Sequence, residues 1–139
     1  MISSLLLGEK KQNTLHKMEL ILDTNFILSC LKEKIEFFDA SNFGEIVIPI
    51  QVLEELDMLQ EKGEMKEREL AELASDIISK HKGKFKVIDL SKKFVDAGIL
   101  KYVQGKKVIV ATLDAELKNK LKGKAKILII RARKKLEVV

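Results

Sequence analysis

Short apolar runs alternate with helix-like segments along the chain, and this alternation restricts the fold more than any other feature. The apolar runs are residues 20–22, 46–48, 85–88, 108–111 and 127–130. The segments between them repeat apolar residues at helical spacing and are residues 24–34, 37–43, 50–62, 64–82, 92–104 and 115–122. Strands that alternate with helices in this way predict an α/β domain with a mainly parallel sheet. Residues 136–139 could add a short edge strand.

Two local features of the helices can also be predicted. Thr24 is a good N-cap for the first helix, because its hydroxyl can accept a hydrogen bond from a free backbone amide. In the longest helix the expected buried face consists of Leu70, Leu73, Ala74, Ile77 and Ile78.

The size and composition indicate one globular domain preceded by a tail. With 139 residues, of which 46% are hydrophobic and 34% charged, the chain can bury a substantial core. We expect residues 1–17 to lie outside a domain of residues 18–139, because residues 8–17 are polar and Leu5–Leu7 is too short for a signal peptide. No apolar run approaches the roughly 20 residues that span a bilayer. The single cysteine, Cys30, cannot form an internal disulfide and fits a reducing, cytoplasmic compartment.

Four acidic residues occupy positions where a solvated charge is not expected. Asp23 ends the first apolar run, at the carboxyl end of an interior strand, and Asp114 follows the fourth run at the start of a helix. Glu55 lies on the border of an apolar helix face, and Asp96 lies among the apolar residues of another. Asp23 and Asp114 could instead simply cap the helices that follow them. Glu55 could reach water, and Asp96 could pair with a lysine.

Taken together, the four acids predict a metal site. If the first and fourth strands are neighbours, Asp23 and Asp114 face each other across one crevice, where like charges need protonation or a cation. Neither His16 nor His81 has other metal ligands near it in the sequence. Oxygen ligands of this kind favour Mg²⁺ or Mn²⁺ over zinc. Such an ion binds phosphate oxygens and activates water, so the site suits hydrolysis of a phosphodiester bond.

Four stretches carry these acids: Leu-Asp-Thr-Asn at 22–25, Pro-Ile-Gln-Val-Leu-Glu-Glu-Leu at 49–56, Asp-Ala-Gly-Ile-Leu at 96–100 and Val-Ala-Thr-Leu-Asp-Ala-Glu-Leu at 110–117. In their order and spacing they resemble the PIN domains, a family of compact metal-dependent ribonucleases. The resemblance covers about residues 19–133. It implies a three-layer α/β/α fold with a central, mainly parallel five-stranded sheet in the order 3-2-1-4-5.

The resemblance also implies roles for single residues. The family's four catalytic acids correspond to Asp23, Glu55, Asp96 and Asp114, with the three aspartates as the main metal ligands. Glu55 would position a water on the metal or complete a second metal site.

The family's helper positions correspond to Thr24, Asn25 and Thr112. Asn25 and Thr112 would orient the ligands, although Asn25 could instead make a backbone hydrogen bond in the first turn of its helix. The chain departs from the family pattern at Leu113, where many relatives have a polar residue, often Asn, and at Ala97, where many have a second Asp. Neither departure removes one of the four acids.

The two halves of the chain carry opposite charge. Residues 1–79 contain 8 basic and 16 acidic residues, whereas residues 80–139 contain 18 basic and 5 acidic residues. A basic half indicates a polyanionic partner such as RNA, although solvated surface lysines would give the same count. The candidate RNA contacts are Lys106, Lys107, Lys118, Lys122, Arg131 and Arg133. Because the chain has no Trp and one Tyr, we expect binding dominated by phosphate contacts and sensitive to salt.

The sequence therefore predicts a Mg²⁺- or Mn²⁺-dependent endoribonuclease, acting in RNA processing or as a toxin. The resemblance implies RNA as substrate, an antitoxin or a ribosome-maturation protein as partner, and homodimers, which are common in the family. The alternative is a non-catalytic PIN-like domain that binds RNA or protein. A phosphoacceptor domain of the receiver type fits the order of motifs poorly. A dinucleotide-binding enzyme lacks its Gly-x-Gly-x-x-Gly turn after the first strand.

Overall fold

The structure, a computed structural model, describes residues 18–139. Its helices are α2 (Thr24–Lys32), α3 (Ile50–Lys62), α4 (Met65–Lys80), α5 (Val95–Tyr102) and α6 (Ala115–Leu121), with the 3-10 helices η1 (Phe37–Asn42) and η2 (Ala132–Lys134). Its strands are β1 (Glu19–Leu22), β2 (Glu45–Pro49), β3 (Lys86–Ile88), β4 (Val108–Ala111), β5 (Lys126–Arg131) and β6 (Lys135–Val138). The predicted tail of residues 1–17 lies outside the described residues.

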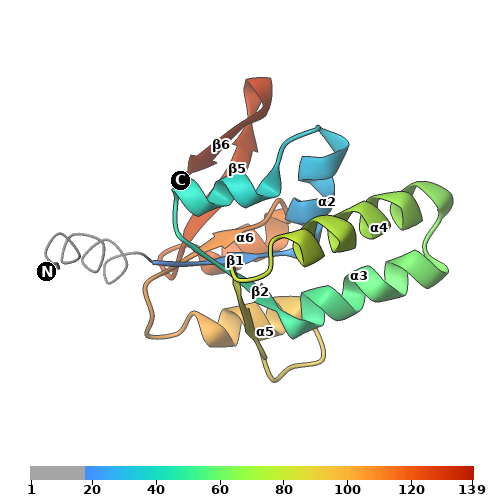
Figure 1. Ribbon diagram of the computed structural model, residues 1–139. Helices are drawn as coiled ribbons and strands as arrows, with labels where there is room; N and C mark the ends of the chain where they lie inside the picture. The colour runs from blue at the N-terminus through green and yellow to red at the C-terminus, as the bar shows by residue number, and fades with distance from the viewer. Residues whose placement is uncertain (1–17) are drawn as a thin grey trace, which may run out of the picture.

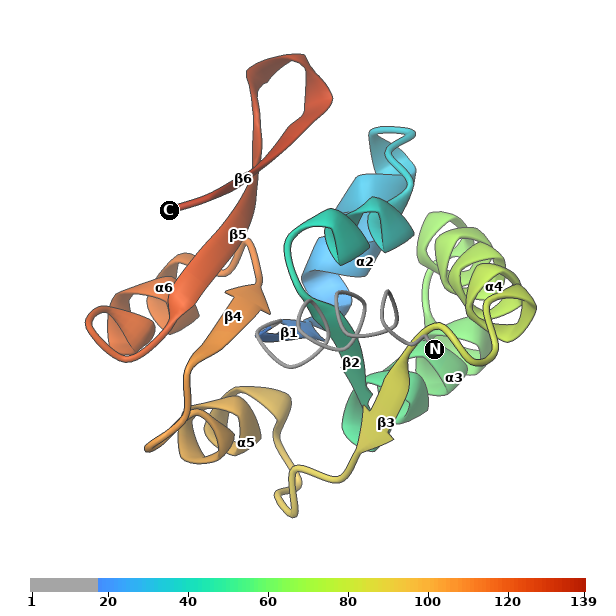
Figure 2. The same ribbon diagram turned by 60° about the vertical axis from the view of Figure 1, so that its left-hand side comes forward.

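The six strands form one sheet in the order β3-β2-β1-β4-β5-β6. The first five strands in this order pair in parallel, which confirms the predicted order 3-2-1-4-5, and β6 adds an antiparallel edge strand. Helices α2, α3 and α4 cover one face of the sheet, and α5 and α6 cover the other (Figures 1 and 2). The predicted three-layer arrangement is thus confirmed. The hairpin of β5 and β6 projects beyond the layers (Figure 2).

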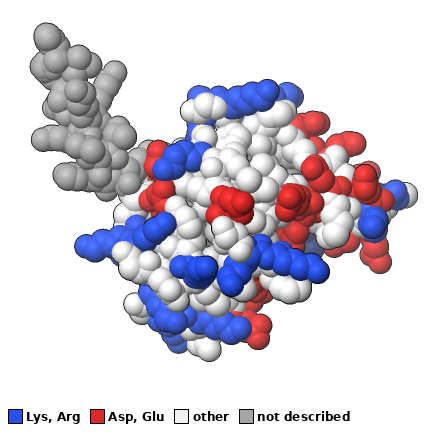
Figure 3. All heavy atoms as spheres, turned by 90° about the horizontal axis from the view of Figure 1, so that it is seen from below, with Lys and Arg blue, Asp and Glu red and all other residues white. Residues whose placement is uncertain are grey.

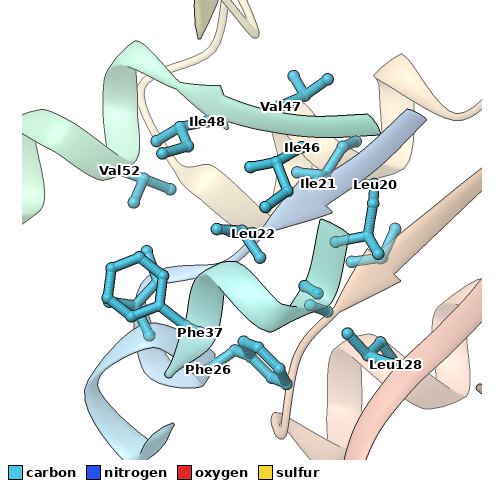
Figure 4. Packing of buried hydrophobic residues seen from close by; sticks show 14 of the residues in the cluster. Leu20, Ile21, Leu22, Phe26, Phe37, Ile46, Val47, Ile48, Val52 and Leu128 are labelled. Carbon is cyan, nitrogen blue, oxygen red and sulfur yellow. The ribbon is translucent and has the colours of Figure 1, made fainter. Parts of the chain in front are cut away.

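The core is built around β1, which lies between β2 and β4. Leu20, Ile21 and Leu22 have no exposed surface, because both faces of this central strand are covered by helices. Phe26 of α2 and Phe37 of η1 pack in the same cluster (Figure 4). The apolar run of β1 ends at Leu22, and Asp23 is the first residue beyond the carboxyl edge of the sheet.

Two local predictions are wrong. The N-cap of α2 is Asp23, whose side chain accepts from the Thr24 amide, so the cap lies one residue earlier than expected. Leu73 of α4 is 46% exposed, because the helix packs through Ala71, Ala74 and Ile78. Leu73 lies about 100° around the helix from Ala74 and about 200° from Ala71, so it points away from this contact face.

None of the helices within residues 18–139 has the length and apolar character that a membrane crossing requires. Cys30 is buried in α2, and its burial raises the pKa of the thiol to about 12. The residue is therefore a small core side chain and not an ionised nucleophile.

Candidate active site

Strands β1 and β4 bring two polar residues to the same edge of the sheet. They pair in parallel with Leu22 opposite Ala111, and the Asp23 amide donates a 3.0 Å hydrogen bond to the Ala111 carbonyl oxygen. Asp23 and Thr112 therefore emerge side by side, each as the first residue after its strand. This is the carboxyl edge of the sheet, where parallel α/β folds place their ligands.

Asp23 is a buried carboxylate that accepts hydrogen bonds on both oxygens. Its residue is 4% exposed. The Oδ1 atom accepts a 2.8 Å bond from the Thr24 amide, and the Oδ2 atom accepts a 2.7 Å bond from the Thr112 hydroxyl. The two bonds fix the orientation of the carboxylate at the end of β1.

Thr112 connects Asp23 to the turn that carries Asp114. The Thr112 hydroxyl, which is fully buried, also accepts a 3.1 Å bond from the Asp114 amide. The Asn25 side-chain oxygen accepts a 3.1 Å bond from the Leu113 amide. The Asn25 oxygen therefore bonds across to the turn after β4, and not within the first turn of its own helix.

Asp114 also caps a helix. It is the N-cap of α6, and its Oδ1 atom accepts a 2.9 Å bond from the Leu117 amide. The capping alternative is therefore correct for both Asp23 and Asp114. A capping carboxylate uses one oxygen for its own helix, so Asp114 keeps a second oxygen that can bind another group.

All four predicted acids line one hollow. Asp23, Glu55, Asp96 and Asp114 border an open space of about 250 Å³. The rest of its wall consists of Thr24, Asn25, Leu28 and Val95. These side chains come from α2, α3, α5 and the turn before α6, which meet at the carboxyl edge of the sheet.

Burial and mutual repulsion disfavour the charged forms of two of these acids. The pKa of Asp23 is raised from 3.8 to about 6, chiefly by burial, with the charges of Asp96 and Glu55 adding to the rise. The hydrogen bonds from Thr112 and the Thr24 amide oppose this shift. Burial and the charge of Asp114 also raise the pKa of Asp96.

The four acids share the hollow, but they do not surround a single point as the ligands of a bound metal ion would. Among residues 18–139, no three His, Cys, Asp or Glu side chains are arranged so as to hold one metal ion. Two contacts draw carboxylate oxygens toward protein donors: Thr24 donates to Glu55, and the Leu117 amide donates to Asp114. The acids therefore share one hollow while several of their oxygens serve hydrogen bonds.

The predicted RNA contacts divide into three groups. Lys118 and Lys122 lie on one flank of α6, as their spacing indicates, and border a groove with Ile127 and Val139. Lys106 and Lys107 precede β4, so they lie at the amino edge of the sheet, opposite the acidic hollow.

The third group lies on the projecting hairpin. Arg131 forms a 2.6 Å ion pair with Glu137 across β5 and β6. Arg133 sits in the hairpin turn, where its backbone φ is 64°. None of the six basic residues is among those that line the acidic hollow.

Two contacts at the site were not predicted from the sequence. Thr24 donates its hydroxyl to Glu55 Oε1 and so links the start of α2 to α3. Lys120 of α6 lies close enough to Asp96 for its charge to oppose the rise in the pKa of that carboxyl. The spacing of α6 contains a signal for the second contact, because Lys120 lies on the opposite flank of the helix from Lys118 and Lys122.

The fold and the site together define a parallel α/β domain with an acidic hollow at the carboxyl edge of its central strands. A sequence model of the family described as "PIN like domain" matches residues 20–135. The chain belongs to this family, which confirms the resemblance seen in its four acidic stretches.

Two relatives agree with this assignment. Ribonuclease VapC4 of Methanocaldococcus jannaschii is 32% identical over 127 residues, which cover 86% of this chain and 95% of that protein. A solved structure of the PIN domain endonuclease Utp24 is 28% identical with a TM-score of 0.66, and the match covers 86% of this chain and 90% of that one. Similarity to both proteins extends over nearly the whole described domain.

Proposed function

We propose that this protein is a metal-dependent endoribonuclease that hydrolyses RNA phosphodiester bonds at the four-carboxylate hollow. One observation carries the proposal: Asp23, buried at the end of the central strand, shares a hollow with Glu55, Asp96 and Asp114. Helix capping does not explain why Glu55 and Asp96 lie in the hollow, because neither residue is the N-cap of its helix.

The residues of the hollow fit Mg²⁺ or Mn²⁺. The acidic donors are all carboxylate oxygens, and the neighbouring polar groups are hydroxyl and amide oxygens, which are hard ligands. Burial raises the pKa of Asp23 to about 6, so a cation beside this carboxyl would favour its charged form. Asp23, Asp96 and Asp114 would hold the ion, with Glu55 beside them. When bound, the ion would neutralise these carboxylates and polarise a phosphate oxygen of the substrate.

The protein's own groups would then orient the reaction. Thr112 and the Thr24 amide hold the Asp23 carboxylate, and Asn25 holds the turn that carries Asp114. Glu55 accepts the Thr24 hydroxyl on Oε1, so its orientation is set while Oε2 can accept a proton from the attacking water. Leu28 and Val95 form apolar wall beside the acids.

The names of the two relatives support this chemistry, because one is a ribonuclease and the other an endonuclease. The proposal includes both of the biological settings that the sequence resemblance implies. In one the protein is a toxin held by an antitoxin, and in the other it matures RNA with a ribosome-associated partner. Both settings place the chain in the cytoplasm, and either is compatible with a homodimer.

The test is RNA cleavage by purified protein with added Mg²⁺ or Mn²⁺ and with EDTA. Asp23→Asn and Asp114→Asn should abolish cleavage, because each removes a ligand charge while Asn keeps the capping oxygen. The matched control is Asp57→Asn, which changes an exposed acid on α3 outside the hollow. Equal cleavage by all four proteins would mean that the activity belongs to a contaminant or to another site.

A non-catalytic RNA- or protein-binding domain is the second candidate. It is favoured by one observation, the absence among residues 18–139 of three acidic side chains already arranged around one point. A calorimetric titration of the protein with Mn²⁺ distinguishes the endonuclease from the non-catalytic domain. An endonuclease should bind the ion, and Asp23→Asn should weaken that binding, whereas a non-catalytic domain should show neither effect.

A further inference from the structure

A second open space lies at the amino edge of the sheet, at the end of β4 and β5 opposite the acidic hollow. It measures about 490 Å³ and is bordered by four lysines, namely Lys106, Lys107, Lys124 and Lys126. Lys106 and Lys107 precede β4, whereas Lys124 and Lys126 lie at the start of β5. Because these two strands are neighbours in the sheet, the two lysine pairs face the same space.

The charge of these lysines is not neutralised within the described part of the chain. None of the four forms an ion pair among residues 18–139, and no acidic residue borders the space. The charge of Lys106 helps to lower the pKa of Glu19, but the contacts of that carboxylate are made by Lys86 at 2.9 Å and by the Tyr102 hydroxyl at 2.6 Å. The Lys106 ammonium lies 3.6 Å from the centre of the Tyr102 ring, so this lysine is held in place by a cation–π contact.

The lysine-lined space joins the groove beside α6. Gly123 and Ala125 border both, so the two spaces lie next to each other. Lys118 and Lys122 line the groove, and so does Ala115, the residue after Asp114. We call the six lysines Lys106, Lys107, Lys118, Lys122, Lys124 and Lys126 the lysine track. Because α6 begins directly after Asp114, the track extends from the edge of the sheet that holds the acidic hollow to the opposite edge.

The distribution of charge over the surface agrees with a lysine track on one side of the molecule. Lysine and arginine side chains are spread over the top, left and lower parts of the view in Figure 3. Acidic side chains are most numerous on the right, the side on which α3 and α4 lie in Figure 1, with a few in the centre and on the left. On this face a polyanion therefore meets mainly positive charge on one side and mainly acidic side chains on the other.

We propose that the lysine-lined space at the amino edge is a distal anchor for the phosphate backbone of RNA whose scissile bond lies in the acidic hollow. The inference rests on the proposed ribonuclease function and specifies how that site would select its substrate. Phosphates bound along the lysine track would hold the strand on both sides of the α6 groove. The isolated domain would then prefer single strands long enough to reach from one edge of the sheet to the other.

The length of β4 gives a lower limit for the span. Four residues of strand cover about 13 Å, and stacked nucleotides advance about 3.4 Å each along one strand, so at least about four nucleotides separate the hollow from the anchor. An RNA of about three nucleotides cannot occupy both places, whereas one of about twenty nucleotides can.

The test measures binding of labelled single-stranded RNA to the Asp23→Asn protein in EDTA, so that the RNA stays intact and cleavage does not enter the result. The anchor variant is Lys107→Gln, Lys124→Gln and Lys126→Gln, which leaves the contact between Lys106 and Tyr102 in place. The matched control is Lys62→Gln, Lys66→Gln and Lys80→Gln, which removes three exposed lysines from α3 and α4. Both variants lose the same charge, and equal thermal melting shows that both are folded.

The expected result concerns the dependence of the dissociation constant on salt. For the long RNA, the anchor variant should lower the slope of log Kd against log salt by about 2, because each lost phosphate contact on a single strand removes about 0.7. The control should keep the parent slope, and the anchor variant should bind the short RNA as the parent does. Replacement of the same three anchor residues by Arg should restore the slope.

Three results would overturn the proposal. The anchor variant could bind long RNA as the parent does, or the control could lose as much affinity as the anchor variant. Polyglutamate could displace the long RNA from the anchor as well as unlabelled RNA does, which would identify an acidic protein as the better occupant. If the wild-type protein fails to cleave RNA but the anchor variant still loses the slope, the nuclease function fails and the RNA-binding surface stands.

Discussion

The Thr112 hydroxyl donates a 2.7 Å hydrogen bond to Oδ2 of Asp23, although 89 residues of sequence separate the two side chains. The bond joins the ends of β1 and β4, and the same hydroxyl accepts from the Asp114 amide. One buried side chain thus sets the position of two of the four acids.

Thr112→Val should therefore reduce activity about 10- to 100-fold, the usual effect of removing a group that orients a metal ligand. The variant keeps the shape of the side chain but leaves Asp23 and the Asp114 amide each without one partner. Thr112→Ser should keep most of the activity, because it retains the hydroxyl. Steady-state cleavage of one RNA by the three proteins decides the matter, and a fully active Thr112→Val would show that this bond does not orient the site.

The buried charge of Asp23 should make the metal-free protein less stable at neutral than at acidic pH. Its pKa is raised from 3.8 to about 6 in the folded state, so between these values the folded protein binds more protons than the unfolded chain. This contribution is fully present below about pH 4 and is lost as pH rises through about 6, with a total of about 3 kcal/mol.

Urea denaturation in EDTA at about pH 4.5 and pH 7 measures this effect. Between these two pH values, the free energy of unfolding should fall more, or rise less, for the wild-type protein than for Asp23→Asn. Asp23→Asn should also be at least as stable as the wild type at neutral pH, because it removes a repelled, buried charge. A large loss of stability would show that the capping role of Asp23 outweighs its electrostatic cost.

Gly98 should control the position of Asp96. A Cβ atom at residue 98 would lie 2.6 Å from the Leu90 Cβ atom, so any side chain there must push α5 away from the segment before it. We expect Gly98→Ala to destabilise the protein by about 1–3 kcal/mol and to lower activity through displacement of Asp96. A chemical denaturation curve and a cleavage assay give the two values. Ala97→Gly, at the exposed neighbouring position, serves as the control for helix propensity.

Cys30 should resist thiol reagents in the folded protein. It has no exposed surface, and burial raises the pKa of its thiol to about 12, so almost no thiolate exists near pH 8. Ellman's reagent should therefore modify one thiol per chain in urea and essentially none in buffer. Rapid modification of the native protein would show that α2 opens readily from the core.

The alternation of strands and helices could be predicted from local patterns, whereas the sheet order came from the resemblance to the PIN domains. The inward placement of the four acids was also predicted, and the structure brings them to one hollow. The run Leu20–Leu22 ends at Asp23 where the sheet ends, and Pro49 ends β2 one residue before α3 begins. The bounds of α3 are those expected, because Pro49 and Gly63 punctuate both of its ends.

Other features depend on packing that a periodic pattern does not contain. Leu73 looks buried from its spacing, but Ala71 and Ala74 form the contact face, and the depth of a small-residue contact is set by the partner helix. The bond between Thr24 and Glu55 joins residues 31 positions apart, and it exists only once α2 and α3 have packed together. Lys106 precedes β4 and Asp114 follows it, so the two residues lie at opposite edges of the sheet. This could have been inferred from the order of the elements.

The unequal charge of the two sides has a kinetic consequence. If RNA is the substrate, a strand that approaches the α3–α4 side would meet like charge and be deflected, whereas one that approaches the lysine side would be drawn in. The protein would then align the RNA during diffusion, before contact. Raising the ionic strength should slow this guided encounter far more than it hastens departure of the strand once bound.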